Sequence, residues 1–162
     1  MINLLEKFSN WLSKVGAYIS SLLLMGLVIL IMTEIIGRSF FDYSTMIADE
    51  YSGYFYLAAV FFGLAYTFNE GGHIRINIIT SRLSKNKRRF FDVFSGILSS
   101  GVMIFAGYYS LLYMIDSKEM EMLSENVSET PLYLTQIPMS IGLVFFILSF
   151  IVFTFKGIFN DH

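Results

Sequence analysis

The stretch VGAYISSLLLMGLVILIMT, residues 15–33, has no charged side chain and lies between Lys14 and Glu34. Three more uncharged stretches of similar or greater length follow it, at 51–69, 93–115 and 130–155. A helix needs roughly 20 apolar residues to cross the hydrocarbon core of a bilayer. Because lipid offers no hydrogen bonds, each such stretch must pair its backbone internally as a helix. We therefore predict an all-α membrane protein with four transmembrane helices, at about residues 15–36, 50–69, 92–115 and 133–156.

The composition is consistent with one four-span domain covering residues 1–162. Hydrophobic residues make up 55% of the chain and charged residues only 15%, well below the charged fraction of a soluble domain. The absence of cysteine excludes disulfides, cysteine-ligated zinc and iron–sulfur clusters. With no nucleophile–base motif or phosphate-binding loop, we expect neither an enzyme nor a bound cofactor. The net charge of −2 gives no reason to expect a nucleic-acid partner.

The basic residues predict the orientation of the chain. Nine of the 11 Lys and Arg lie in the amino-terminal segment, the 70–92 connection or the carboxyl tail. Short loops rich in Lys and Arg stay on the cytoplasmic side. Both termini are therefore predicted to be cytoplasmic, with the 35–50 and 116–130 connections facing outward. In a Gram-negative bacterium this describes a multi-pass protein of the inner membrane.

Two segments are predicted to form interfacial amphipathic helices. In residues 1–14, apolar residues recur at helical spacing, with Trp11 suited to the headgroup region. We favour an interfacial helix here over a helix that continues straight into the first span. The connection that follows His73 contains Arg88 and Arg89 and could hold anionic phospholipid headgroups. His73 itself follows two glycines, and we interpret it as a hydrogen-bonding residue at a helix end.

No Asp, Glu, Lys, Arg or His lies near the middle of any predicted span. Ion-coupled carriers usually place such a group there, so the chain is not expected to transport alone. Glu34 and Arg38, four residues apart at the outward end of the first span, are the exception. They can form a local pair or an anchoring contact to a partner subunit.

Small residues at i and i+4, such as Ala59 and Gly63, allow close approach of helices in lipid. They favour a packed bundle or an interface with another membrane protein, although such pairs also occur by chance. The outward connections are acidic, with Asp42 and Glu125 among their residues. They are either solvated loops or a surface for a soluble partner of complementary charge.

Several short motifs follow one another along nearly the whole chain, namely Arg38, Asp49-Glu50, Gly63, Ala65, Gly72-His73-Ile74, Ile76-Asn77, Thr130-Pro131-Leu132-Tyr133, Ile137-Pro138 and Gly142. Together they resemble the small membrane subunit of tripartite ATP-independent periplasmic (TRAP) transporters, the DctQ type. Their order and spacing along nearly the whole chain carry the resemblance, more than any single motif. The family often has a tryptophan and paired glutamates where this chain has residues 47–50, and aspartate where it has Asn77.

The resemblance implies a scaffold role beside two partners. In that family a large multi-span subunit holds the substrate and sodium sites, and a soluble periplasmic binding protein delivers an organic acid, such as a C4-dicarboxylate or a sialic acid. The candidates for the contact with the large subunit are Glu34, Arg38, Glu50 and Gly63. The candidates for docking of the binding protein are Asp42, Tyr43 and Glu125.

Two other functions are compatible with four spans. A self-sufficient small transporter acting as an oligomer would need a membrane carboxylate, for which Glu34 is the candidate. A membrane anchor of a redox enzyme would bind haem or quinone. The two histidines, His73 and His162, are not placed for haem ligation inside the membrane.

Overall fold

The computed structural model describes residues 2–71 and 85–159, and in these ranges the regular structure is helical. The helices are α1 (Ile2–Phe41), α2 (Ala48–Asn69), α4 (Lys85–Glu119) and α5 (Leu132–Phe159). The prediction of an all-α chain is therefore confirmed.

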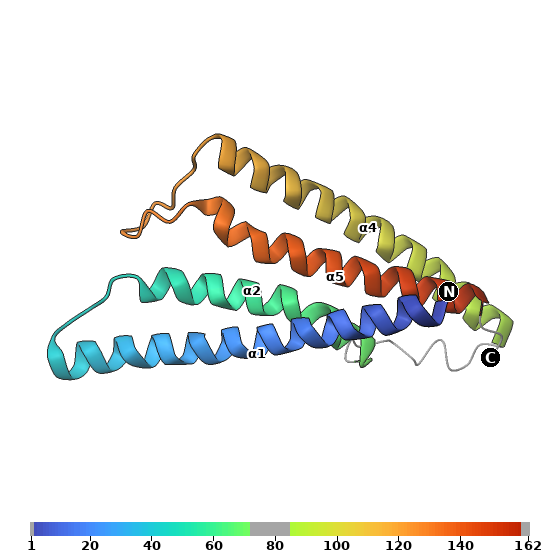
Figure 1. The fold of residues 1–162 in the computed structure, drawn as a ribbon, viewed down its shortest axis with the longest axis horizontal. Coiled ribbons are helices and arrows are strands. Elements are labelled where there is room, and N and C mark those ends of the chain that lie inside the picture. The colour runs from blue at the N-terminus through green and yellow to red at the C-terminus, as the bar shows by residue number, and fades with distance from the viewer. Residues whose placement is uncertain (1, 72–84, 160–162) are drawn as a thin grey trace.

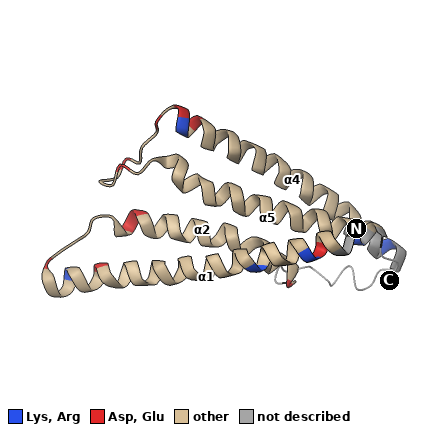
Figure 2. Ribbon diagram, in the orientation of Figure 1, with Lys and Arg blue, Asp and Glu red and all other residues tan. Residues whose placement is uncertain are grey.

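Three of these helices, α1, α4 and α5, are long and apolar enough to cross a membrane. The helix α2 has 22 residues, which is sufficient length, but it is not among the three. Four of its residues are tyrosines, which lower its mean hydropathy. Charged residues lie toward the helix ends and leave the central part of each helix uncharged (Figure 2).

The first helix is continuous, which differs from the favoured expectation of a separate helix over residues 1–14. The 40 residues of α1 run through Lys14 and Val15 without interruption, and this is the alternative of a helix continuing into the first span. At 1.5 Å per residue α1 is about 60 Å long. Gly16, next in the chain, lies within the helix and lets α2 pack directly against it, because a Cβ at Gly16 would lie 2.6 Å from the carbonyl oxygen of Phe62.

The helices lie side by side in the order α1, α2, α5, α4, so that α2 and α5 are central and α1 and α4 form the edges (Figure 1). The beginning of α1 and the end of α5 meet at one end of the molecule. There the Nζ of Lys156 lies 2.6 Å from Oε1 of Glu6, and the hydroxyls of Ser9 and Ser149 are 3.3 Å apart. The two described connections, 42–47 and 120–131, lie at the opposite end, which we call the loop end.

Small residues bring the two central helices and α1 into close contact. Gly142 of α5 faces Phe61 of α2 so closely that a Cβ would lie 2.6 Å from the Phe61 carbonyl carbon and oxygen. Ser20 of α1 donates a hydrogen bond of 2.7 Å to the carbonyl of Ala59, and a Cβ at Gly63 would lie 3.2 Å from the Ser20 hydroxyl. Gly63, a candidate for a partner contact, thus packs within this chain.

The edge helix α4 is attached to α5 by polar side chains. The hydroxyls of Ser110 and Ser140 are 3.0 Å apart and both residues are buried. The side-chain amide of Gln136 donates to the hydroxyl of Ser117 over 3.0 Å. Hydrogen bonds of this kind help hold helices together in lipid, where apolar surfaces alone have little reason to associate.

Candidate functional site at the loop end of the bundle

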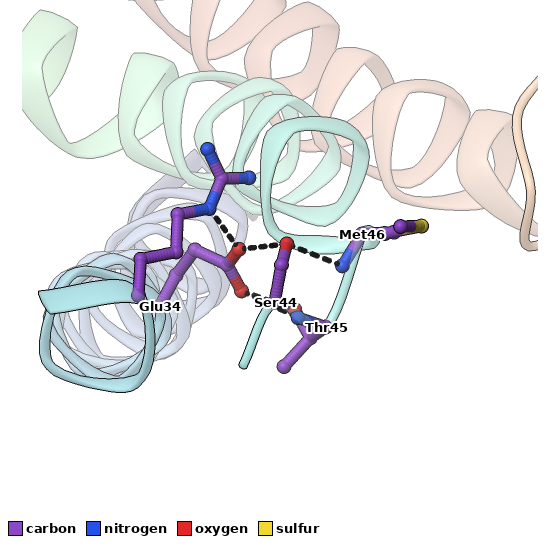
Figure 3. Close-up of polar contacts among 5 residues, drawn as sticks. Glu34, Ser44, Thr45 and Met46 are labelled. Atoms are coloured by element: carbon purple, nitrogen blue, oxygen red, sulfur yellow. Dashed lines mark hydrogen bonds and ion pairs between the residues drawn. The ribbon is translucent and has the colours of Figure 1, made fainter. Parts of the chain in front are cut away.

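A buried carboxylate on α1 organises the first connection. Glu34 is only 7% exposed, and its Oε1 accepts hydrogen bonds from Nε of Arg38 at 2.5 Å and from the hydroxyl of Ser44 at 2.6 Å. Its Oε2 accepts from the backbone N–H of Thr45 at 3.0 Å and from the Thr45 hydroxyl at 2.5 Å. Figure 3 shows these groups converging on the carboxylate. These hydrogen bonds hold the 42–47 connection against α1, the helix that precedes it.

The backbone of the same connection takes up a constrained shape. Asp42 and Met46 have φ values of 49° and 57°, in the left-handed region that residues other than glycine seldom adopt. The N–H of Tyr43 donates to the carbonyl of Gly37 over 3.1 Å, as at the end of many helices. The hydroxyl of Ser44 also accepts the N–H of Met46 at 3.3 Å. The bonds to Glu34 offset the cost of these backbone conformations.

A second buried carboxylate, on α2, holds the other connection. Glu50 is 9% exposed, and it accepts hydrogen bonds from the hydroxyls of Tyr54 and Ser128, each 2.6 Å long. Beside it, the hydroxyls of Tyr51 and Thr130 are 3.1 Å apart. These contacts fasten the segment before α5 to the beginning of α2.

The 120–131 connection is itself hydrogen-bonded as a short antiparallel turn of chain. Leu123 and Pro131 form an isolated β-bridge. The N–H of Ser124 donates to the carbonyl of Thr130, and the N–H of Leu132 donates to the carbonyl of Met122, both over 2.9 Å. The segment is therefore held both by its own backbone and by Glu50.

The candidate residues fall into distinct groups in the structure. Glu34 and Glu50 bind this chain's own connections, and Arg38 pairs with Glu34 while its side chain stays 54% exposed. The docking candidates Asp42, Tyr43 and Glu125 are exposed at the loop end. Away from the loop end, Trp11 is exposed on α1, Arg88 and Arg89 belong to the first turn and a half of α4, and His73 lies outside the described residues.

Sequence reasoning missed all but one of the hydrogen-bond donors of the two carboxylates. It predicted the pair of Glu34 and Arg38 from their spacing, but not Ser44, Thr45 or Ser128. The only sequence signal for these three is a hydroxyl in a short connection next to a buried carboxylate, and the burial becomes known only from the fold. Such networks of charge-assisted hydrogen bonds are strong when every partner is present.

The polar residues at the loop end hold the two connections in place. Both carboxylates already accept two or more hydrogen bonds from their own chain. Among the described residues no group of three His, Cys, Asp or Glu side chains could hold a metal ion. The arrangement is suited to fixing the shape of two surface connections.

Replacing Ser128 with alanine is expected to loosen the 120–131 connection, because Glu50 loses the donor of a 2.6 Å hydrogen bond while staying buried. Limited proteolysis of the purified protein should then cut this connection faster than in the unchanged protein. Glu125→Ala, in the same connection but on an exposed residue, is the matched control. Equal cleavage of the two variants would show that the Glu50 contact does not hold the segment.

Comparison with known proteins identifies the family. Residues 27–160 match the family described as "Tripartite ATP-independent periplasmic transporters, DctQ component". A protein of Haemophilus influenzae assigned by name to the TRAP transporter small permeases is 23% identical over 150 residues, covering 93% of this chain and 91% of that protein. The ectoine TRAP transporter small permease protein TeaB of Halomonas elongata is 27% identical over 113 residues, covering 70% of this chain and 58% of TeaB.

These matches and the apolar helices describe a multi-pass membrane component of a transporter rather than an enzyme, and they confirm the resemblance found in the motifs. The chain belongs to the DctQ family, the small permease component of the tripartite ATP-independent periplasmic transporters.

Proposed function

We propose that this chain is a non-transporting scaffold subunit of a sodium-coupled TRAP uptake system in the bacterial inner membrane. It pairs with a large multi-span membrane subunit and helps a soluble periplasmic binding protein to dock. The observation that carries the proposal is that no Asp, Glu, Lys, Arg or His lies near the middle of any of the four long apolar stretches. In addition, the carboxylates of Glu34 and Glu50 already accept hydrogen bonds from this chain's own connections. A substrate and ion path is then expected in the partner chain.

A scaffold must hold its shape while another domain moves, and two features of the fold support this role. The central helices are in close backbone contact at Gly142, which lies against Phe61. The connections at the loop end are closed by Glu34 and Glu50. For the contact with the large subunit we propose Arg38, because Glu34 orients its guanidinium while more than half of the side chain stays exposed.

The position in the membrane follows from the same proposal. Trp11 is 60% exposed on α1, and an exposed tryptophan near a helix end is suited to the headgroup region. Lys87 is exposed near the beginning of α4 and can contact phospholipid headgroups. With the loop end facing the periplasm, Trp11 and Lys87 lie near the cytoplasmic face.

The cargo is proposed to be an organic acid of the C4-dicarboxylate or sialic acid class. One relative is named for ectoine, so ectoine belongs in the panel of substrates to be tested. No residue of this chain is assigned to substrate selection, because the substrate site is expected in the large subunit and in the binding protein.

The proposal is tested by expressing the tagged chain with its native neighbours and extracting the membranes in mild detergent. A large multi-span protein should co-purify in stoichiometric amount. The reconstituted pair should take up an organic acid only with the binding protein and an inward sodium gradient. Uptake by the purified chain alone would instead favour a self-sufficient transporter.

The docking role predicts the effect of charge reversal at the loop end. In the reconstituted system, Asp42→Lys combined with Glu125→Lys should raise severalfold the concentration of binding protein needed for half-maximal uptake, because complementary charges steer association. The effect should shrink with added salt, which screens exposed charges. Glu70→Lys, an exposed acidic residue at the other end of the molecule, is the control. Unchanged uptake and unchanged dependence on the binding protein would count against the docking role.

A further inference from the structure

The described residues leave one long face of the edge helix α4 uncovered. It packs on α5 through positions such as Gly96, Gly107 and Ser110. On the side of the helix away from α5, exposed residues recur every three or four positions, namely Phe94, Leu98, Gly101, Phe105 and Tyr108. This is the spacing of a seam onto which another helix can pack.

Two tyrosines of this face lie near the middle of the membrane-spanning region. Tyr108 and Tyr109 are next to Ser110, whose hydroxyl meets that of Ser140 on α5. On α4 itself, the two tyrosines lie four and five residues past the midpoint of the uncharged stretch 93–115. The half-thickness of a hydrocarbon core is about 15 Å, and at 1.5 Å per residue this offset from the midpoint places both tyrosines inside the expected core.

The hydroxyls of both tyrosines lack an acceptor in the part of the chain that the structure describes, where the two rings make aromatic contacts only. The side chains are 58% and 54% exposed. Tyrosines that face lipid usually lie at the interface, where the hydroxyl meets water. A phenol hydroxyl left in hydrocarbon costs several kcal/mol without a hydrogen bond. Each of the two hydroxyls would therefore be stabilised by an acceptor from outside the described residues.

The neighbouring residues form a preorganised surface around the tyrosines. The ring centroids of Phe105 and Tyr109 are 4.6 Å apart, and those of Tyr108 and Tyr109 are 5.4 Å apart. One turn before Phe105, a Cβ at Gly101 would meet nothing within 4 Å. An open glycine beside large rings gives a partner helix a place to approach the α4 backbone closely.

We propose that a transmembrane helix of the large subunit packs against the α4 aromatic face, which consists of Gly101, Phe105, Tyr108 and Tyr109. That helix presents hydrogen-bond acceptors, from polar side chains or an interrupted backbone, to the two tyrosine hydroxyls. The inference rests on the proposed pairing with a large subunit and adds the face and its chemistry. Lipid tails are excluded as the occupant because they offer no acceptor, and a second copy of this chain is separated by the test.

The first test is Gly101→Leu in the co-expressed complex. Because the space around Gly101 is open within this chain, the variant should fold and insert, but it should retain about tenfold less of the large subunit. Gly53→Leu, at an equally open glycine on α2, is the matched control and should retain the large subunit. Indistinguishable retention in the two variants, whether high or low, overturns the proposal.

The second test removes the hydroxyls alone. Tyr108→Phe combined with Tyr109→Phe should weaken retention of the large subunit by about three- to tenfold, the usual effect of one or two hydrogen bonds in a membrane. Tyr18→Phe, at a 75% exposed tyrosine nearer the end of α1, makes the same chemical change and should have no effect. Equal retention in the double variant and in Tyr18→Phe contradicts the hydrogen-bonding role.

A photo-cross-linking amino acid at Phe105 identifies the occupant in the complete complex. An adduct with the large subunit is expected. An adduct with a second copy of this chain, or with lipid alone, overturns the assignment. If the unchanged chain does not bring down a large subunit at all, the proposed function fails. If it does, and these variants and cross-links show no effect, only the α4 face is wrong.

Discussion

Replacing Gly142 with leucine is expected to prevent α2 and α5 from packing. A Cβ at this position would lie 2.6 Å from the carbonyl carbon and oxygen of Phe61 and 2.8 Å from its Cβ. Two of these atoms are backbone, so no side-chain rotation can relieve the overlap, and the central pair of helices must separate. Overpacking ordinarily costs about 1–3 kcal/mol, and this substitution should cost about 3 kcal/mol or more. The measurement is the thermal stability of the detergent-solubilised protein, followed by size-exclusion chromatography.

A graded series gives this prediction its control. Gly142→Ala already introduces the overlapping Cβ, so it should destabilise, but less than leucine, whose longer side chain must also be accommodated. Gly53→Leu, at a glycine with open space on the same pair of helices, should leave the stability unchanged or slightly raised, because glycine is a poor helix former. Equal stability of Gly142→Leu and Gly53→Leu would mean that the helices are not in backbone contact.

Replacing Glu34 with alanine is expected to release the 42–47 connection. The substitution removes the acceptor of the Ser44 and Thr45 hydroxyls, the Thr45 N–H and the Arg38 guanidinium at once. The unusual backbone conformations of Asp42 and Met46 then lose the contacts that offset their cost. Among single polar substitutions at the loop end, this one should have the largest effect. Hydrogen exchange of the Thr45 amide should accelerate strongly, together with proteolytic cleavage of the connection.

Two further variants separate the charge from the shape of the Glu34 side chain. Glu34→Gln keeps one acceptor oxygen but places an amide donor where the other oxygen stood, so its exchange rate should be intermediate. Arg38→Gln removes only the partner that is more than half exposed, and an exposed partner contributes little, so exchange should stay close to that of the unchanged protein. Slow exchange of the Thr45 amide in Glu34→Ala would show that the connection is held by other contacts.

Local composition predicts most of the architecture, but it does not predict where the helices begin and end. Uncharged stretches of about 20 residues were enough to predict four helices, because lipid leaves the backbone no other way to satisfy its hydrogen bonds. The predicted first span ended at about residue 36, whereas α1 extends from Ile2 to Phe41. Charged residues such as Lys14 and Arg38 mark where apolar composition ends, but they are good helix formers and do not end a helix.

The loop end shows the same division between local and distant information. The i, i+4 spacing of Glu34 and Arg38 predicted a contact that the structure contains. The contact of Glu50 with Ser128 joins residues 78 positions apart, and no local pattern connects them. It depends on α2 and α5 lying side by side, as they do where Gly142 meets Phe61.

The sequence by itself determined the class of the molecule, the number of its long helices in the described residues and its family, since these depend on runs of apolar residues and on short motifs in order. Only the tertiary structure decided which small residues form helix contacts within this chain and which carboxylates are buried against its own connections. It also decided that Tyr108 and Tyr109 are exposed on the side of α4 away from α5. The physical reason is that burial and hydrogen-bond pairing belong to pairs of segments. Their cost or benefit is defined only when both segments are in place.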